Sequence, residues 1–306
     1  MRLIPYLVSG IATLGLVLSL TSCGEENKGN GKKPETTTSG TINISVDEGY
    51  KPVIEQQLKV FDSSYPEAHI TPYFKSEKQC FDDLFKDSSG LILTARDLTA
   101  AEKKVYEKNG VPLRSLAVAM DAIAIVVHPK SVDTFMTLGQ LKGIMTGSFT
   151  RPYTIVFDNA QSSTVRYIVD SLIPGQQLSS KSYAVKSNQA VIEYVAQNEN
   201  AIGILSVGYV WDEESTSELG EFKKGVKVVS LKNDVTGEFY QPYLGNIALF
   251  QYPLTRDLYF ITRDNGYGLS AGFANFICSE RGQLIFKKSR LVPLRVQLNI
   301  REVDIK

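Results

Sequence analysis

Histidine, cysteine and tryptophan are scarce in this sequence of 306 residues, which has two, three and one of them. The histidines, His69 and His128, stand alone, and the cysteines are scattered. Neither pattern has the ligand spacing that is typical of a zinc site. The G-x-x-x-x-G-K-S/T loop that binds nucleotide phosphates is also absent. We therefore expect no metal site and no cofactor.

An excess of charge of either sign is lacking too. The chain has 33 basic and 33 acidic residues, so its formal net charge is zero. Proteins that bind nucleic acids usually carry a broad basic face. The balance therefore argues against a nucleic-acid partner, and no internal repeat indicates a solenoid.

The longest uncharged apolar run is short. Arg2 precedes an apolar core at residues 7–20, whereas a membrane span needs about 20 apolar residues. The following L-T-S-C, which ends at Cys23, resembles a bacterial lipobox. We expect a signal peptide at residues 1–22 and a lipid on Cys23. The alternative is an ordinary secretory signal with an incidental cysteine.

The segment after Cys23 has no apolar residue to bury, so residues 23–40 are predicted to form a flexible tether. The folded part then begins near Thr41 and is long enough for one large domain or two lobes. Cys80 and Cys278 lie beside phenylalanines in helix-like stretches. We expect buried free thiols there, although an exported compartment would permit a disulfide.

Strand and helix patterns alternate along the folded part. Strands are expected at residues 41–46, 69–74, 91–95, 122–127, 154–157, 201–205 and 259–262. Helices are expected to begin at Pro52 and Thr99 and to cover residues 78–86, 165–173, 189–197 and 269–288. Residues 213–225 are polar and predict a surface excursion. This order predicts an α/β fold with mainly parallel strands.

Three polar loops follow predicted strands, where ligands bind in open α/β sheets. They are residues 47–49, residues 94–97 and the segment after Phe157. The first two contain the acids Asp47, Glu48 and Asp97.

The third loop places Gln161, Ser162, Ser163 and Thr164 before a helix whose first turn contains Arg166. A hydroxyl there can simply be an N-cap. A guanidinium near a helix N-terminus is unfavourable unless an anion lies between them. A bound oxyanion would satisfy the backbone N–H groups, the hydroxyls and the arginine together. Asp158 is the competing partner for the arginine, so both readings stay open.

The acidic loops suit a protonated anion, because a carboxylate accepts a hydrogen bond from a ligand O–H. Hydrogen phosphate carries such a proton near neutral pH and sulfate does not. A carboxylate among many donors would therefore select phosphate. Alternatively, Asp47 and Glu48 only complement a helix N-terminus, and Arg96 neutralises Asp97 locally.

One motif hints at an enzyme. Residues 268–272 match G-x-S-x-G, a nucleophile elbow in hydrolases. That fold needs a histidine downstream of the serine, and both histidines lie upstream. We read the motif as a glycine-rich turn at a helix start and expect no enzymatic activity.

Five segments, in order, resemble those of the phosphate-binding proteins of ABC importers (PstS-like). They are D-A-I-A-I-V-V-H-P (121–129), T-L-G-Q-L-K-G-I-M-T-G (137–147), N-A-I-G-I (200–204), Y-P-L-T-R (252–256) and the closing segment 273–293. The resemblance covers nearly all of residues 41–294.

This resemblance implies a type II periplasmic-binding-protein fold: two α/β lobes, a ligand cleft and two crossover segments. Lobe one would comprise residues 41–126 plus 255–306, and lobe two residues 127–254. The family's S-G-T anion loop falls on Ser162-Ser163-Thr164, and its S-D step on Arg96-Asp97, which makes Asp97 the reader of the ligand proton. Its first-lobe T-F falls near Asp47-Glu48, and its S-S-G-G turn near Ser76.

The sequence departs from that family at the anion loop. The S-S-T triplet lacks the glycine that lets the backbone approach a ligand closely. Asp158 stands where some members have an arginine, and Arg166 is the proposed substitute.

Together these features predict a monomeric, extracytoplasmic solute-binding lipoprotein, held at a bacterial membrane by Cys23 and facing the periplasm or cell exterior. It would capture an oxyanion, phosphate above others, and deliver it to an ABC permease. The alternatives are another small ligand, including a cationic group drawn by the acids, or a surface sensor or interaction protein with the same fold.

Overall fold

The computed structural model of the protein describes residues 35–296, except 213, 218 and 265. The predicted signal peptide, the lipidation of Cys23 and the tether up to residue 34 lie outside the described residues. The tether prediction is wrong for residues 35–40, because Glu35 accepts a hydrogen bond from Leu269 N–H at 2.8 Å and Gly40 begins the first strand, β1 (Gly40–Asp47). No helix in the described part is both long and apolar enough to cross a membrane.

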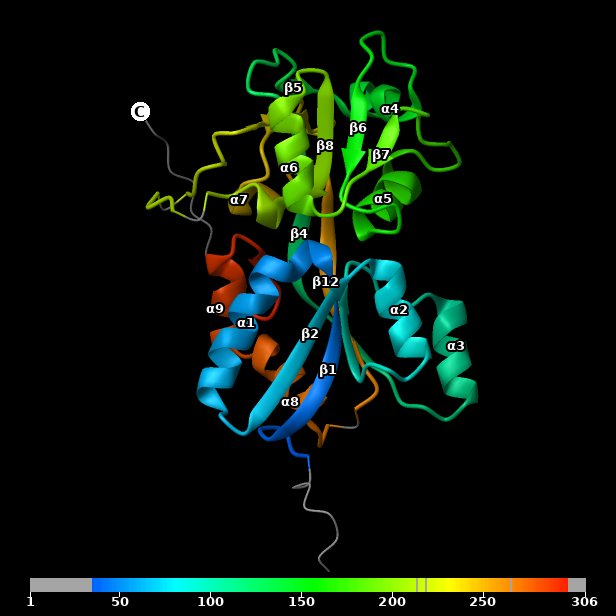
Figure 1. The fold of residues 1–306 in the computed structure, drawn as a ribbon, viewed down its shortest axis with the longest axis vertical. Coiled ribbons are helices and arrows are strands. Elements are labelled where there is room, and N and C mark those ends of the chain that lie inside the picture. The colour runs from blue at the N-terminus through cyan, green and yellow to red at the C-terminus, as the bar shows by residue number, and fades with distance from the viewer. Residues whose placement is uncertain (1–34, 213, 218, 265, 297–306) are drawn as a thin grey trace, which may run out of the picture. The chain divides into compact units, whose positions relative to one another are not determined.

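One sheet runs through both lobes in the order β2-β1-β3-β12-β4-β8-β6-β7, with β13 and β9 paired to β4 (Figure 1). Its strands are β1 Gly40–Asp47, β2 Ala68–Lys75, β3 Leu91–Thr94, β4 Arg114–Val127, β6 Thr154–Phe157, β7 Ser182–Ala184, β8 Ala201–Ser206, β9 Lys227–Val228, β12 Thr255–Thr262 and β13 Val292–Pro293. A second sheet joins β11 (Phe239–Tyr240), β10 (Ser230–Lys232) and β5 (Phe135–Met136).

The outer strands of each lobe are parallel, as the sequence predicts. β1 pairs in parallel with β2 and β3, and β6 with β7 and β8. The prediction of mainly parallel strands is wrong in the middle of the sheet, where β12 is antiparallel to β3 and β4, and β4 to β8. β4 and β12 carry the chain between the lobes in opposite directions, so they pair antiparallel.

Helices cover the sheet in each lobe (Figure 1). They are α1 Lys51–Ser64, α2 Glu77–Phe85, α3 Ala100–Lys108, α4 Leu138–Thr146, α5 Ser163–Tyr167, α6 Asn188–Gln197, α7 Leu244–Ala248, α8 Leu269–Cys278 and α9 Glu280–Lys288. The 3-10 turns η1 (Glu48–Tyr50) and η3 (Val207–Tyr209) and the π-helical turn η2 (Ile168–Leu172) complete the described helical segments. In lobe one, α1 packs on α9 and β2, while α2 packs on β1 and β3.

Each lobe has its own hydrophobic core. The core of lobe two contains the second half of β4, with β6, β8 and α6. Two clusters in lobe one contain β1 and β3 with α1 and α8, and α2 with α3. The apolar face of each amphipathic helix is thereby removed from water, which is the dominant favourable contribution to folding.

Two predicted helices differ from the structure. Residues 269–288 form two helices, because Ser279 leaves the helical conformation and caps α9 by accepting a hydrogen bond from Gly282 N–H. The stripe at residues 165–173 continues from the short α5 into η2.

Two further sequence predictions are confirmed. Cys80 and Cys278 are both free, as predicted, but only Cys80 is buried, and the prediction that Cys278 is buried is wrong because it is half-buried. Gly268 is the N-cap position of α8, so the G-x-S-x-G match is a turn at a helix start.

Candidate functional site: a chamber of helix N-caps between the lobes

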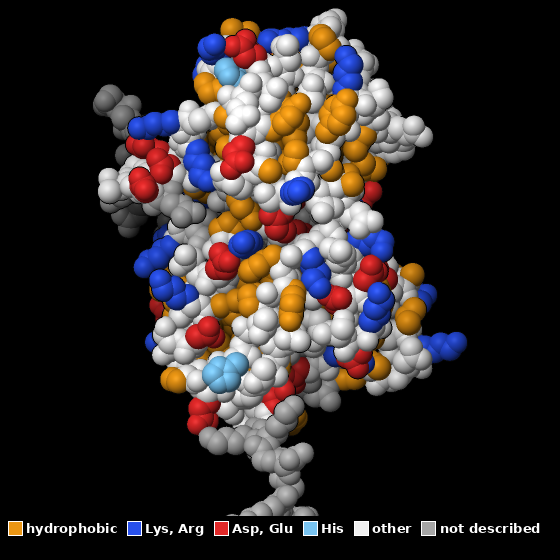
Figure 2. Space-filling model, in the orientation of Figure 1, with side chains coloured by type: hydrophobic (Ala, Val, Ile, Leu, Met, Phe, Trp, Pro, Cys, Tyr) orange, Lys and Arg blue, Asp and Glu red, His pale blue; other side chains and the backbone are white. Residues whose placement is uncertain are grey.

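A cavity of about 330 Å³ lies where helix N-termini of both lobes meet. Its lining residues are Asp47, Glu48, Lys51, Phe74, Lys75, Ser76, Gln79, Asp158, Asn159, Ser162 and Lys186. We call it the N-cap chamber, because three of these residues are the N-caps of η1, α2 and α5. Figure 2 shows acidic and basic side chains together at the constriction between the lobes.

Each N-cap residue is held by a hydrogen bond to the turn that it begins. Asp47 Oδ1 accepts from Gly49 N–H at 3.0 Å. Ser76 forms a complete capping box with Gln79. Ser162 Oγ accepts from the backbone N–H three residues later at 3.3 Å. The positive ends and free N–H groups of such termini favour anions, so this convergence can hold one.

The chamber also contains two buried carboxyl groups that each have one oxygen without a hydrogen-bond partner among the described residues. Asp47 and Asp158 are each 1% exposed, and Asp47 Oδ2 and Asp158 Oδ1 have no hydrogen-bond partner among the described residues. Burial, and then the charge of Glu77, raise the pKa of Asp47 to about 7, against the opposing charge of Arg256. Burial also raises the pKa of Asp158, and burial together with Asp158 raises that of Glu48. Asp47 can therefore hold a proton near neutral pH.

Three lysines supply positive charge to the wall: Lys51, Lys75 and Lys186. Lys75 Nζ lies 2.6 Å from Asp83 Oδ2, which also accepts a hydrogen bond from Ser45. The wall therefore contains both positive lysines and acidic side chains, so a ligand in the chamber can both accept and donate hydrogen bonds.

Sequence reasoning missed Arg256. This arginine is only 6% exposed, and its guanidinium binds Asp121 Oδ2 at 2.8 and 3.0 Å. It also donates to Ser163 Oγ at 2.8 Å, which links a crossover strand to the anion loop. Arg256 and Asp121 are direct register partners in β12 and β4. One sequence feature could have indicated this pair: Asp121 and Arg256 each lie in a segment that resembles the phosphate-binding family, at residues 121–129 and 252–256.

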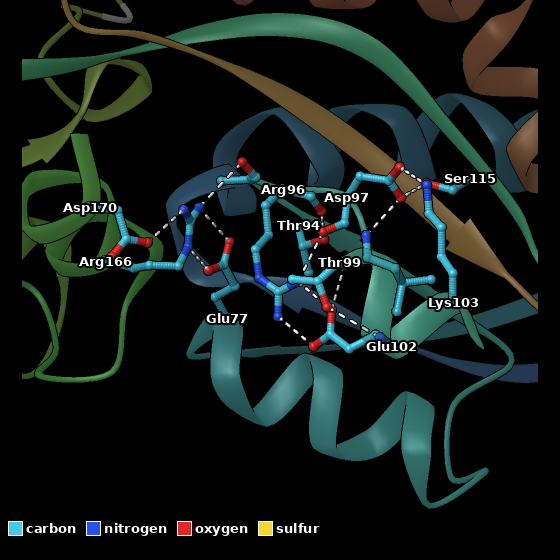
Figure 3. A network of polar contacts seen from close by, with 12 residues as sticks. Glu77, Thr94, Arg96, Asp97, Thr99, Glu102, Lys103, Ser115, Arg166 and Asp170 are labelled. Carbon is cyan, nitrogen blue, oxygen red and sulfur yellow. Dashed lines mark hydrogen bonds and ion pairs between the residues drawn. The ribbon is translucent and has the colours of Figure 1, made fainter. Parts of the chain in front are cut away.

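Arg166 finds its partner in the other lobe. Its guanidinium forms an ion pair with Glu77, the first residue of α2, and donates to the Ala95 carbonyl at 3.4 Å (Figure 3). Asp170 lies 3.7 Å from it on the next turn. The alternative in which Asp158 pairs with Arg166 is therefore wrong. The buried Glu77 carboxylate supplies the negative charge that this arginine needs beside a helix N-terminus.

Arg96 and Asp97 are each engaged elsewhere (Figure 3). Arg96 forms a two-pronged pair with Glu102 at 2.8 and 3.0 Å, so its predicted pairing with the Asp97 carboxylate is wrong. Asp97 accepts hydrogen bonds from Lys103 at 2.5 Å and Ser115 at 2.6 Å. Partial burial raises the pKa of Asp97, but these contacts outweigh that effect and bring the pKa below its ordinary value.

The structure divides the ten predicted ligand residues. Four of them line the N-cap chamber: Asp47, Glu48, Ser76 and Ser162. Ser163 lies behind it against Arg256. The other five do not line it: Arg96, Asp97, Gln161, Thr164 and Arg166. Their roles as ligands stay predictions.

Comparison with known proteins identifies the family. A family model described as the PBP superfamily domain matches residues 31–281. The chain belongs to the PBP superfamily. Among its curated relatives is the phosphate-binding protein PstS of Bacillus subtilis, 24% identical over 277 residues, or 85% of this chain and 83% of the relative. PstS of Staphylococcus epidermidis is 22% identical over 292 residues, with 90% and 85% covered.

Solved structures of this superfamily share the fold. A phosphate ABC transporter substrate-binding protein with bound phosphate from Clostridium perfringens matches with a TM-score of 0.70 at 23% identity. The match covers 83% of this chain and all of that one. The type II periplasmic-binding-protein fold, with two α/β lobes and two crossover strands, is therefore confirmed.

Proposed function

We propose that this PBP superfamily member is an extracytoplasmic solute-binding protein that captures phosphate in the N-cap chamber and delivers it to an ABC permease. The observation that carries the proposal is the convergence of three helix N-caps, from both lobes, on one cavity lined by three lysines. The PstS relatives are phosphate-binding proteins, which supports the same ligand. Such a protein binds and releases its ligand without chemical change.

The proton that phosphate carries near neutral pH is the basis of the proposed selectivity for phosphate over sulfate. The pKa of Asp47 is about 7, so this carboxyl gains and loses its proton readily at neutral pH. When ionised, it accepts a hydrogen bond from a phosphate O–H; when protonated, it donates one to a phosphate oxygen. Sulfate has no O–H to donate at this pH, so the ionised form of Asp47 discriminates against it, whereas the protonated form can donate to either anion. In this proposal Asp47, with Asp158, takes the proton-reading role that the family resemblance gave to Asp97.

The other parts of the prediction belong to this proposal. The protein is a monomer with lobe boundaries at residues 126/127 and 254/255, and a lipid on Cys23 holds it at the membrane. The ligand-contacting residues are Asp47, Glu48, Ser76, Asp158 and Ser162, with Arg256 acting through Ser163.

Titration calorimetry tests the ligand. The full chain carrying Cys23→Ala is titrated with phosphate, arsenate and sulfate, beside Ser162→Ala and the control Ser180→Ala, whose serine is exposed and lines neither cavity. We expect phosphate and arsenate to bind, sulfate to bind at least about tenfold more weakly, and Ser162→Ala to weaken phosphate about fivefold. Failure of every oxyanion to bind would contradict the proposed ligand.

A ligand with a cationic group is the second candidate. It is favoured by the carboxyl groups of Asp47, Glu48 and Asp158 in one wall. Amino acids that carry an ammonium or guanidinium group are titrated in the same calorimeter, and the titrations are repeated at lower pH. Only a cationic ligand would lose affinity as the carboxyl groups of the chamber gain protons.

A further inference from the structure

A second cavity lies in the described part of the chain, apart from the N-cap chamber. It has a volume of about 520 Å³ and shares no lining residue with that chamber. We call it the Trp211 chamber; Tyr50, Val53, Trp211, Ser215, Lys288 and Arg290 are among the residues that line it. Asp47 and Glu48 line the N-cap chamber, whereas Gly49 and Tyr50, the next residues of η1, line the Trp211 chamber.

Its wall comes from both lobes. α1 and the end of α9 supply the lobe-one side, and the other side is supplied by Ser206, Gly208, Trp211, Asp212 and Ser215. Any occupant therefore contacts both lobes at once.

The charged groups of the wall are mainly positive. Lys288 and Arg290 line it, against one carboxylate, Asp212. The Arg290 guanidinium lies 5.8 Å from the centroid of the Trp211 ring and donates to the Ser217 carbonyl at 3.2 Å. The last turn of α9 explains Lys288 in part, since a cation there complements the helix dipole. Arg290, two residues beyond it, adds a second cation to the wall.

A buried donor lies in the same wall. Trp211 is 6% exposed, and its Nε1 has no hydrogen-bond partner among the described residues. An indole N–H can only donate, and leaving it unpaired in a buried position costs free energy. Its ring stacks on Phe222 at 4.4 Å between centroids, which fixes the indole in place.

Apolar side chains, including Val53, Val60, Ile285 and Leu291, share the remaining wall with the polar Gln56, Ser206, Ser215 and Ser289. A cavity of several hundred Å³ with an apolar lining and a few convergent polar groups is the usual form of a small-molecule site.

We propose that the Trp211 chamber is a second ligand site, which takes a small organic anion with an apolar body and a single carboxylate-type head. The head lies against Lys288 and Arg290, one of its oxygens accepts the Trp211 N–H, and the body covers the apolar wall. An inorganic anion leaves that wall uncovered. The site does not depend on the function proposed for the N-cap chamber.

The chain provides its own reporter, because Trp211 is the single tryptophan of the sequence. An isotopically nitrogen-labelled full chain carrying Cys23→Ala therefore gives one indole N–H resonance. The probes are benzoate, benzyl alcohol and benzylammonium, which share a body and differ in charge. We expect benzoate to move the resonance saturably and downfield, benzyl alcohol to bind more weakly, and benzylammonium to leave it in place.

A matched pair of variants tests whether Lys288 binds the carboxylate of benzoate. Lys288→Gln is expected to weaken benzoate about fivefold. Lys287→Gln makes the same charge change one residue away, outside the lining, and should leave affinity unchanged. The proposal is overturned if benzoate causes no saturable shift, if benzyl alcohol binds as well as benzoate, or if Lys287→Gln weakens binding as much as Lys288→Gln.

Discussion

At the residue scale, the N-cap chamber contains buried carboxyl groups whose negative charge is not fully balanced by nearby positive charge. Asp47 is buried near the positive Arg256 and the negative Glu77, and its pKa of about 7 reflects burial first and Glu77 second. A carboxyl whose pKa is raised by folding binds its proton more tightly in the native state. Stability then decreases as pH rises from about 4 to about 7.

Replacing Asp47 with asparagine should therefore stabilise the protein at high pH. The asparagine side chain would keep an oxygen for Gly49 N–H and carry no charge. We expect Asp47→Asn to exceed the parent in unfolding free energy by about 2 kcal/mol at pH 8, and the difference to disappear below pH about 4. Urea unfolding of both proteins at the two pH values measures this. An equal difference at both would show that Asp47 does not titrate as described.

At the element scale, the break between α8 and α9 shows a packing requirement that periodicity does not reveal. A Cβ on Gly282 would overlap the Phe276 carbonyl oxygen, so only glycine lets α9 begin this close to α8. The Gly282 carbonyl also accepts a hydrogen bond from Gln57 of α1 at 2.7 Å. This corner therefore ties three helices of lobe one together.

Gly282→Ala should destabilise the protein by about 2 kcal/mol, because backbone atoms must move to admit the methyl group. Gly245→Ala in α7 is the matched control, since a Cβ there meets no atom within 4 Å. Its effect should be neutral or stabilising by up to about 1 kcal/mol. Thermal or urea unfolding compares the two; equal losses would rule out the steric explanation.

At the scale of the whole folded unit, polar contacts join the lobes around the chamber. Arg166 binds Glu77, and Tyr209 Oη donates to the Glu48 carbonyl at 2.8 Å. The Glu77 side chain is 4% exposed, so removing its partner leaves a buried charge uncompensated. This pair should therefore help to hold the lobes together.

Arg166→Gln should lower the free energy of unfolding by about 2 kcal/mol and increase the radius of gyration in small-angle scattering. The double variant Arg166→Gln with Glu77→Gln removes both charges and should recover most of the loss. A double-variant cycle in urea measures the coupling. Strictly additive losses would mean that the ion pair does not join the lobes energetically.

The sequence by itself determined the elements and their order, because these depend on neighbours close along the chain. Apolar periodicity placed β1, β2, β3, β6 and β8 within one residue, but β4 begins eight residues and β12 four residues before the predicted starts, and the short strands β5, β7, β9, β10, β11 and β13 were not predicted. The capping pattern from Thr99 to Glu102 placed the start of α3. The order of five segments indicated the fold family. Ser162 was recognised as a possible N-cap for the same local reason.

Only the tertiary structure decided which charges meet. Arg166 and Glu77 are 89 residues apart, and Arg256 and Asp121 are 135 apart. No local pattern selects Glu77 over Asp158 as a partner, since each candidate is an acid near a helix N-terminus. Strand register and the approach of the two lobes make that selection, because an ion pair forms only between groups that folding brings within a few ångströms.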